Sequence, residues 1–280
     1  MRMIDTLTLS LSKESILVPS LEGIRTIQSD WGISTKGNYR NLLLSERNDL
    51  VTISGSLQKF NRSESLTFEE CKTSIFNLCE TFSFEPKEAI IKRVDFAKTL
   101  KTYFEPKTYY PFLGSHRSYF RSPYKNSLNY NNSLRVLSFY DKAKEQSITG
   151  NLLRYEARFL KPETIFKRKL YLVDLLTEEV YNHFLLRWKD DYQKIEKIKN
   201  LIPMETFRSP KQLSEFLEAK GANEIGQELI YNQIKIAQRA GNLSKQNAMR
   251  MRKRLKGLSR STFFESNELI KELDSKILIS

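Results

Sequence analysis

The sequence predicts an α+β fold, with a mainly antiparallel sheet backed by helices and followed by a helical C-terminal region. Strand-like segments with alternating side chains fill most of the first 160 residues, with one clear helical pattern among them. After Pro162 the period changes, and apolar residues recur at spacings of three and four. We therefore expect a first domain over residues 1–165 and a helical domain over residues 166–280.

The first part of the chain alternates between strands and polar connections. Residues 4–12, 39–45 and 50–58 have strand patterns, and Gly55 indicates close packing or a bulge in the last of them. A helix follows, capped by Ser65 or Thr67 and ending before Pro86. Three further strands are expected over residues 89–100, 133–142 and 151–160.

Polar side chains share one face of these last three strands. Side chains alternate between the two faces of a strand, so each strand separates into an apolar face and a polar face. Tyr155 belongs to the apolar face. The polar faces carry Arg93 and Asp95, then Tyr140 and Lys142, then Arg154, Glu156 and Arg158. If the strands are neighbours, these groups lie side by side on one surface of the sheet.

Two carboxylates from different strands can hold a divalent cation, either Mg²⁺ or Mn²⁺. A tyrosine beside such an ion can attack a phosphodiester, although its ordinary pKa of about 10 means that the phenol needs help. Lys142 is placed to supply positive charge. The alternative is structural, because arginine–carboxylate pairs are common on strand surfaces and tyrosine is a normal strand residue.

The composition favours a polyanionic partner. The 280 residues contain 46 Lys and Arg against 33 Asp and Glu, which gives a net charge of +13. The isoelectric point near 9.5 points to nucleic acid, and a membrane partner is not expected, since no long apolar run appears. No signal peptide is apparent, and Cys71 and Cys79 fit a reduced, cytoplasmic chain in which both pack as small core residues.

Residues 103–132 are rich in aromatic side chains with cations between them. Such a segment suits unpaired bases, which stack on rings while phosphates meet the charges. The alternative is a long hairpin whose rings pack on the sheet, and this is expected for most of them. We predict a DNA-contacting flap near residues 113–124.

Four helices are expected in the C-terminal region, beginning near Thr177, Ser209, Glu224 and Ser244, with Gly221 ending the second. No acidic residue occurs from Leu229 to Phe264. The last helix is strongly basic, and a basic helix after a short turn can contact duplex DNA, although a solvated basic face is the alternative. The DNA-binding candidates there are Lys245, Arg250, Arg252, Lys253 and Arg254.

Four segments in order resemble the filamentous-phage gene II replication initiators and related phage and plasmid rolling-circle initiators. They are MIDTLTLSL at residues 3–11, KRVDFA at 92–97, LSFYDKAKE at 137–145 and LLRYEARF at 152–159. The last three are similar to the R-[IV]-D, Y-x-K and R-[FY]-E-[AV]-R segments of that family. The resemblance covers roughly the first 165 residues.

The resemblance implies a sheet related to the HUH endonucleases and a nickase that forms a 5′-phosphotyrosine intermediate. Tyr140 matches the nucleophile, Lys142 the lysine of Y-x-K, and Asp95 and Glu156 the metal-binding acids. Arg93, Arg154 and Arg158 would contact DNA. The implied partners are a replication origin, single-stranded at the nick, and a host helicase and polymerase.

The chain departs from the broader superfamily in one respect: its two histidines, His116 and His183, are far apart, so a histidine-pair metal site is excluded. A carboxylate site would replace it, and His116 could add one ligand. Two other functions are left open. One is a mobilisation relaxase, and the other is a non-catalytic origin-binding regulator whose carboxylates form structural ion pairs.

Overall fold

The computed structural model describes residues 3–29, 32–61, 67–198, 209–258 and 266–279. The chain forms two compact units, and the first consists of Met1–Ile198 together with Leu269–Ser280. The second, Lys199–Glu268, is therefore an insertion between two parts of the first. The predicted boundary at residue 165 differs from this division, because residues 166–198 and the C-terminal helix pack with the sheet.

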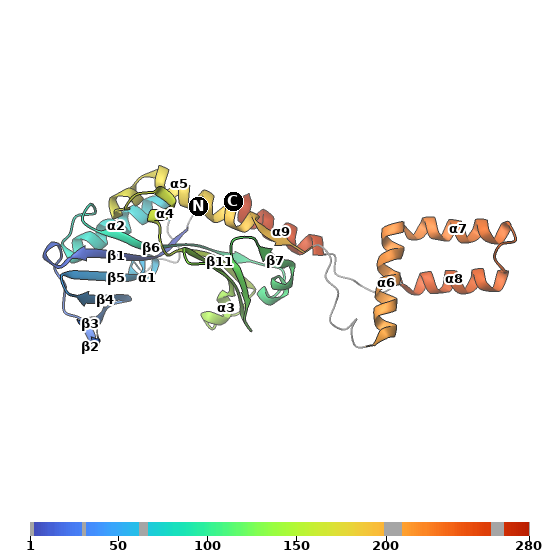
Figure 1. The fold of residues 1–280 in the computed structure, drawn as a ribbon, viewed down its shortest axis with the longest axis horizontal. Helices are drawn as coiled ribbons and strands as arrows, with labels where there is room; N and C mark the ends of the chain where they lie inside the picture. The colour runs from blue at the N-terminus through green and yellow to red at the C-terminus, as the bar shows by residue number, and fades with distance from the viewer. Residues whose placement is uncertain (1–2, 30–31, 62–66, 199–208, 259–265, 280) are drawn as a thin grey trace. The chain divides into compact units, whose positions relative to one another are not determined.

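The first unit is built on a large antiparallel sheet, which confirms the predicted α+β class (Figure 1). In the described residues its strands lie in the order β2 (Glu22–Ser29), β3 (Gly32–Tyr39), β4 (Leu42–Arg47), β5 (Leu50–Ser56), β1 (Ile4–Ser12), β6 (Ile90–Lys101), β11 (Leu152–Phe159), β10 (Arg135–Asp141), β9 (Ser127–Asn131) and β8 (Phe120–Pro123). Strands β7 (Leu113–His116) and β12 (Ile195–Lys197) form a second, two-stranded sheet.

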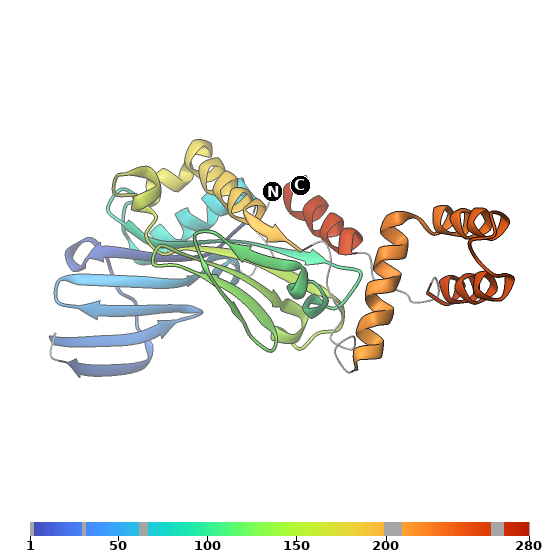
Figure 2. The same ribbon diagram turned by 45° about the vertical axis from the view of Figure 1, so that its right-hand side comes forward.

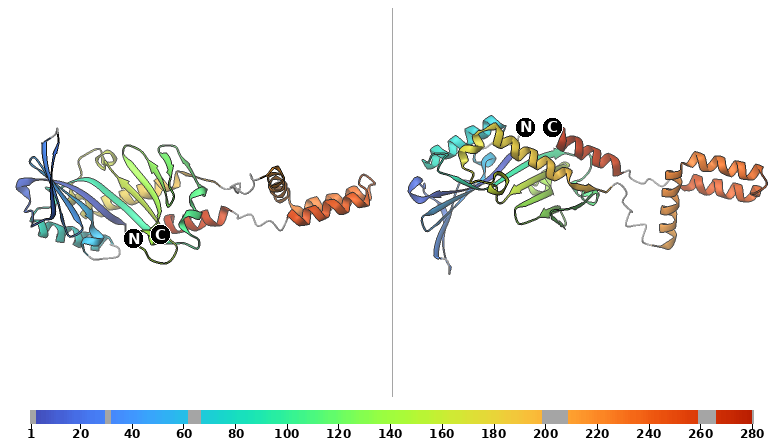
Figure 3. Two further views of the ribbon diagram at one scale, coloured as in Figure 1. Left: turned by 90° about the horizontal axis from the view of Figure 1, so that it is seen from below. Right: turned by 45° about the horizontal axis from the view of Figure 1, so that its top comes forward.

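Helices cover one side of the large sheet. These are α2 (Phe68–Phe82), α4 (Glu163–Phe166), α5 (Glu178–Gln193) and the C-terminal α9 (Ser266–Leu278), which lie together on one side of the strands in Figures 2 and 3. Two further short helices are α1 (Leu57–Phe60) and α3 (Lys142–Glu145), and 3-10 turns occur at Lys13–Ser15, Pro106–Thr108, Tyr110–Phe112 and Leu172–Leu176. No helix in the described part of the chain is long and apolar enough to span a membrane.

The core lies between the sheet and α5. Tyr155 of β11 stacks on Phe139 of β10 and contacts Trp188 of α5, and all three side chains are fully buried. The Tyr155 hydroxyl donates to the Trp188 carbonyl at 3.0 Å. Burial of large aromatic rings is a leading source of stability in such a core. The apolar faces assigned from side-chain alternation are therefore confirmed.

The α2 helix begins where its cap predicts. The Thr67 side chain accepts from the Glu70 amide, and Glu70 accepts from the Thr67 amide at 2.6 Å, which satisfies two amides at the helix end. Gly55 also has the predicted role of close packing, because a Cβ there would lie 2.6 Å from Leu42 Cδ2.

The second unit consists, in its described residues, of α6 (Pro210–Ile225), α7 (Gln227–Arg239) and α8 (Lys245–Leu258). Gly221 was expected to end a helix, and this is wrong: α6 continues through it and ends at Gly226. Gly226 has a φ of 91°, a conformation that only glycine adopts without strain, so the chain breaks there. A second glycine in this conformation, Gly241 with a φ of 78°, lies in the connection between α7 and α8.

The C-terminal α9 returns to the first unit and is held there by its carbonyls. Lys98 of β6 donates to the Lys276 carbonyl at 2.8 Å, and Lys189 of α5 donates to the Leu278 carbonyl at 2.9 Å. Cations at the C-terminal end of a helix satisfy its last carbonyls and complement its dipole. The inserted unit is thus followed by a helix anchored on β6 and α5.

Candidate active site

The open face of the large sheet brings the predicted polar side chains together. Strand β11 lies between β6 and β10, and its register places Arg158 opposite Asp95 of β6 and Arg154 opposite Tyr140 of β10. Residues directly opposite one another in an antiparallel pair project from the same face. The side-by-side arrangement expected from alternation is therefore present.

These side chains line a cleft of about 680 Å³. Its walls include Asp5, Arg93, Asp95, Thr99, Tyr140, Lys142, Glu145, Arg154, Glu156 and Arg158. Every residue predicted for the catalytic and metal sites is in that set, together with the three arginines predicted to contact DNA in the first domain. His116 does not line the cleft; it is buried on β7, where its Nδ1 accepts from the Ser118 amide at 3.1 Å.

Glu156 is the centre of the hydrogen-bond network in the cleft. Its Oε2 accepts from the Tyr140 hydroxyl at 2.9 Å, and its Oε1 accepts from Arg158 Nε at 2.6 Å. Arg154 Nε lies 3.7 Å from Oε2. Because the Glu156 carboxylate is almost fully buried, these partners supply the stabilisation that water would otherwise give it.

Tyr140 is protonated in this arrangement. Burial, followed by the adjacent Glu156 carboxylate, raises the pKa of the phenol, while Arg154 opposes the shift. The hydroxyl therefore needs a proton acceptor before its oxygen can attack, and Glu156 is already hydrogen-bonded to it.

Lys142 begins α3, one residue after β10 ends, rather than continuing the strand as expected. Its ammonium group still lies 5.8 Å from the centre of the Tyr140 ring, and it pairs with Glu145 at 2.8 Å. The lysine is therefore close to the phenol, but its charge is shared with a neighbouring carboxylate.

Asp95 is held by Arg93, which donates from Nε at 2.7 Å and from Nη2 to the second oxygen. The side chain is 1% exposed. Burial raises the pKa of Asp95 to about 6, even though Arg93 opposes the shift. Its negative charge is thus incompletely compensated, and a further cation beside it would be stabilising.

The donor set fits Mg²⁺ or Mn²⁺ only with help from a substrate. In the described residues no group of three or more His, Cys, Asp or Glu side chains could hold a metal ion. Magnesium is commonly bound by one or two carboxylates together with water and substrate phosphates. Asp95 and Glu156 supply hard oxygens of that kind, although arginines now occupy them.

Asp5 of β1 is a site residue that the sequence did not single out. Its Oδ2 pairs with Arg154 Nη2 at 2.9 Å, and its Oδ1 accepts from the Ser56 hydroxyl at 3.2 Å. Strict alternation along β1 would put Asp5 on the apolar face with Leu7, Leu9 and Leu11. The pairing of β1 with β6 shifts register between Ile4 and Leu7, and Asp5 lines the cleft instead.

The aromatic segment over residues 103–132 is mainly part of the core, as the structural alternative predicted. Its buried rings are Tyr109, Tyr110, Phe112, Tyr119 and Tyr130. The other four rings, Tyr103, Phe104, Phe120 and Tyr124, are exposed. Of these, Phe120 and Tyr124 lie at or beside β8, within the expected flap, and are 75% and 60% exposed.

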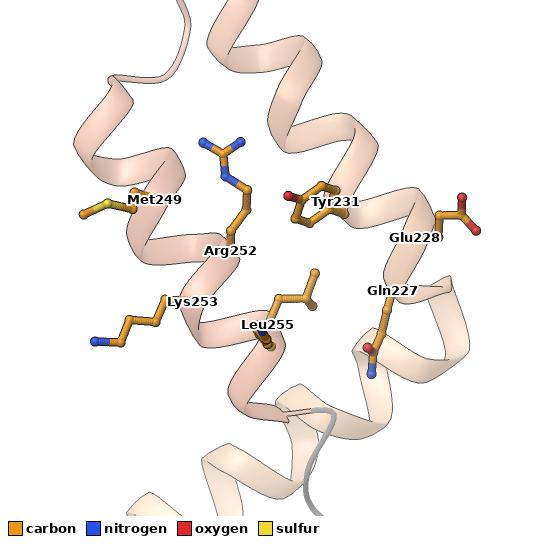
Figure 4. Close-up of a pocket in the computed structure, with 8 residues that line it drawn as sticks. Gln227, Glu228, Tyr231, Met249, Arg252, Lys253 and Leu255 are labelled. Atoms are coloured by element: carbon orange, nitrogen blue, oxygen red, sulfur yellow. The ribbon is translucent and has the colours of Figure 1, made fainter.

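The cations of α8 do not all face solvent. Arg252 lies between α7 and α8, 6.0 Å from the centre of the Tyr231 ring, and donates to Gln238 at 2.8 Å (Figure 4). Arg254 forms two hydrogen bonds with Glu218 of α6. Arg252 is half-buried against α7, whereas Arg254 pairs with α6 but is 64% exposed, so the exposed DNA-binding candidates are Lys245, Arg250, Lys253 and Arg254.

No family model and no curated protein matches this sequence. Among solved structures, a rolling circle replication initiator protein from Geobacillus stearothermophilus is similar to this chain, with 10% sequence identity and a TM-score of 0.41. The similarity covers 75% of this chain and 89% of that one. This low similarity does not establish a function for the chain, and the resemblance to the gene II family stays a prediction.

Glu156→Ala should destabilise the first unit by about 1–3 kcal/mol, because it removes the acceptor of the Tyr140 and Arg158 hydrogen bonds and one of the two carboxylates beside the buried Arg154. Unfolding in denaturant, followed by tryptophan fluorescence, measures the change. Glu145→Ala is the control, since that carboxylate is half-exposed and its removal should cost less than about 1 kcal/mol. Equal effects would show that the Glu156 network is not a buried structural unit.

Lys253→Glu should weaken duplex DNA binding and reduce the slope of log affinity against log salt by about one, as expected for one lost phosphate contact. Lys211→Glu on α6 changes the same charge at another exposed site of the second unit and should leave the slope nearly unchanged. Fluorescence anisotropy at several salt concentrations measures both. Equal slopes for the two variants would contradict a specific role for α8.

Proposed function

We propose that this chain is a rolling-circle replication initiator. In this proposal it is a metal-dependent, site-specific single-strand DNA endonuclease and ligase that acts through a covalent 5′-phosphotyrosine intermediate. The observation that carries the proposal is the Tyr140 hydroxyl, 2.9 Å from a buried carboxylate in a cleft that also contains Arg93, Arg154 and Arg158. A nucleophile, a proton acceptor and donors for a phosphate are the parts that phosphodiester transfer requires.

In the nicking step the Tyr140 oxygen attacks the phosphorus and transfers its proton to Glu156. The bond from phosphorus to the 3′ oxygen breaks, and that oxygen takes a proton from water to become a 3′ hydroxyl. The 5′ phosphate stays joined to Tyr140. Joining is the reverse, with a 3′ hydroxyl attacking the phosphotyrosine and the phenol regaining its proton.

Arg154 is suited to bind the phosphate that reacts. Its Nη1 donates to Thr99 at 3.1 Å and its Nη2 pairs with Asp5, whereas its buried Nε has no hydrogen-bond partner among the described residues. A buried N–H without an acceptor costs free energy. A phosphate bound in the cleft would place negative charge beside three guanidinium groups, and its oxygen would reach Nε after a small shift of the side chains that now cover that atom.

A divalent ion held by Asp95 and Glu156 would add charge neutralisation at the phosphate when bound. Lys142 would supply positive charge near the Tyr140 phenol. DNA phosphates on either side of the reacting group would meet Arg93 and Arg158, which lie at the exposed rim of the network, 31% and 38% exposed.

The rivals differ in what they require of the cleft. A non-catalytic origin-binding protein would use these ion pairs only for structure, so it would need no phenol hydrogen-bonded to a buried acid. A mobilisation relaxase would use the same strand transfer. Nicking of a replication origin rather than of a transfer origin separates it from the proposed initiator.

Tyr140→Phe should abolish both nicking and the covalent protein–DNA species, because it removes the attacking oxygen and keeps the ring. Incubation with single-stranded origin DNA and separation on a denaturing gel measures both products. Tyr155→Phe is the matched control, since its hydroxyl bonds the Trp188 carbonyl on the other side of the sheet. A persistent covalent species in Tyr140→Phe would assign the nucleophile to another residue.

Nicking should depend on Mg²⁺ or Mn²⁺ and should stop in excess chelator. Asp95→Asn should reduce it strongly by removing a metal-binding charge, while keeping the shape that packs against Arg93. Asp49→Asn, at an exposed position, should leave the rate unchanged. Full activity with chelator present would mean that the arginines act without a metal ion.

A further inference from the structure

The open face of the sheet continues past Tyr140 onto β9 and β8, and its chemistry changes there. The register places Asn131 between Val136 of β10 and Phe120 of β8. The neighbouring row places Asn129 between Ser138 and Ser122. Across β10 these two rows lead to Arg158 and Glu156 of β11. These two rows therefore carry amides, hydroxyls and the Phe120 ring on β8 and β9, while the charged groups lie at β11 and β6.

Phe120 stands out on this surface because it is 75% exposed in the edge strand of the sheet. Its partner across the strand pair is an asparagine, and the next position on the same face of β8 is a serine. Protein interfaces are centred on clustered apolar side chains, whereas the nearest strand positions to Phe120 in the described residues are polar. A flat ring bordered by hydrogen-bonding groups suits a ligand that has a flat face and polar edges.

Nucleic acid bases have that chemistry when they are unpaired. Aromatic side chains stack on unpaired bases, and asparagine amides can bond to base edges. The Asn131 amide is oriented by its hydrogen bond to Ser122 at 3.2 Å. Two strand spacings across and four residues along the sheet put Phe120 roughly 16 Å from Tyr140, which is the length of a few nucleotides.

We propose that Phe120, Ser122, Asn129 and Asn131 form a base-binding surface for the unpaired DNA strand whose phosphate lies at Tyr140, with Phe120 stacking on a base. This inference rests on the proposed function, because that function brings single-stranded DNA to the cleft. The backbone near the reacting phosphate meets the arginines, and the bases a few nucleotides away meet an uncharged surface.

Phe120→Trp tests the stacking directly. In the Tyr140→Phe background, which cannot react, a single-stranded oligodeoxythymidylate should quench the added tryptophan fluorescence, and a blunt duplex should not. Phe76→Trp is the matched control, because Phe76 is 49% exposed on α2, among the helices that cover the sheet. Equal responses of the two variants to the oligonucleotide would overturn the proposal.

Phe120→Ala in the same background should weaken single-strand affinity by about 5- to 150-fold, the range expected for one lost base stack, and Phe120→Trp should retain it. Phe76→Ala should bind normally. Unchanged affinity in Phe120→Ala, or tighter binding of oligouridylate than of the DNA oligomer, would refute the assignment.

These outcomes are separable from the fate of the proposed function. If Phe120→Ala loses affinity but the native chain does not nick DNA, the base-binding surface is supported and the nicking activity is refuted. If a covalent species forms at Tyr140 but Phe120→Ala has no effect, the nicking activity is supported and the base-binding surface is refuted.

Discussion

The buried Glu156 carboxylate is the group on which the cleft depends. It accepts one hydrogen bond from Tyr140 and another from Arg158, and Arg154 is held close to it. A buried carboxylate is tolerated only when it is paired and hydrogen-bonded. The same contacts orient the phenol and fix two guanidinium groups at the wall of the cleft. The free energy that stabilises this part of the sheet and the geometry that permits chemistry therefore come from one set of interactions.

One face of the sheet stabilises the fold, and the other carries the polar groups of the cleft. The face toward α5 is mainly aromatic and closed, and a buried ion pair joins Arg135 of β10 to Asp191 of α5 at 2.7 Å, so this face holds the strands in register. Register matters because a shift of one residue would exchange the faces of β10 and move Tyr140 into the core. The open face can then carry charged groups at β6 and β11 and uncharged ones at β8 and β9. The bases and the backbone of a bound DNA strand would thus contact different parts of one continuous protein surface.

The sequence predicted much of this arrangement and missed what depends on distant packing. Alternation was sufficient to assign Tyr140, Arg154 and Glu156 to one face, because period two is a local property. It could not show that Asp5 reaches Arg154, since β1 and β11 are joined only through β6. The basic character of α8 also could not show that Arg252 packs against α7 while Lys253 is exposed, because that difference depends on contacts with another helix.

The most direct test of the central claim is the site of the covalent bond. After reaction with single-stranded origin DNA and Mg²⁺, nuclease and trypsin digestion should leave a nucleotide on one peptide, which mass spectrometry identifies. Tyr140 is the only tyrosine in the tryptic peptide of residues 136–142, so the account predicts the added mass there. Modification of a peptide from residues 103–132 would contradict it and would place the nucleophile outside the Glu156 network.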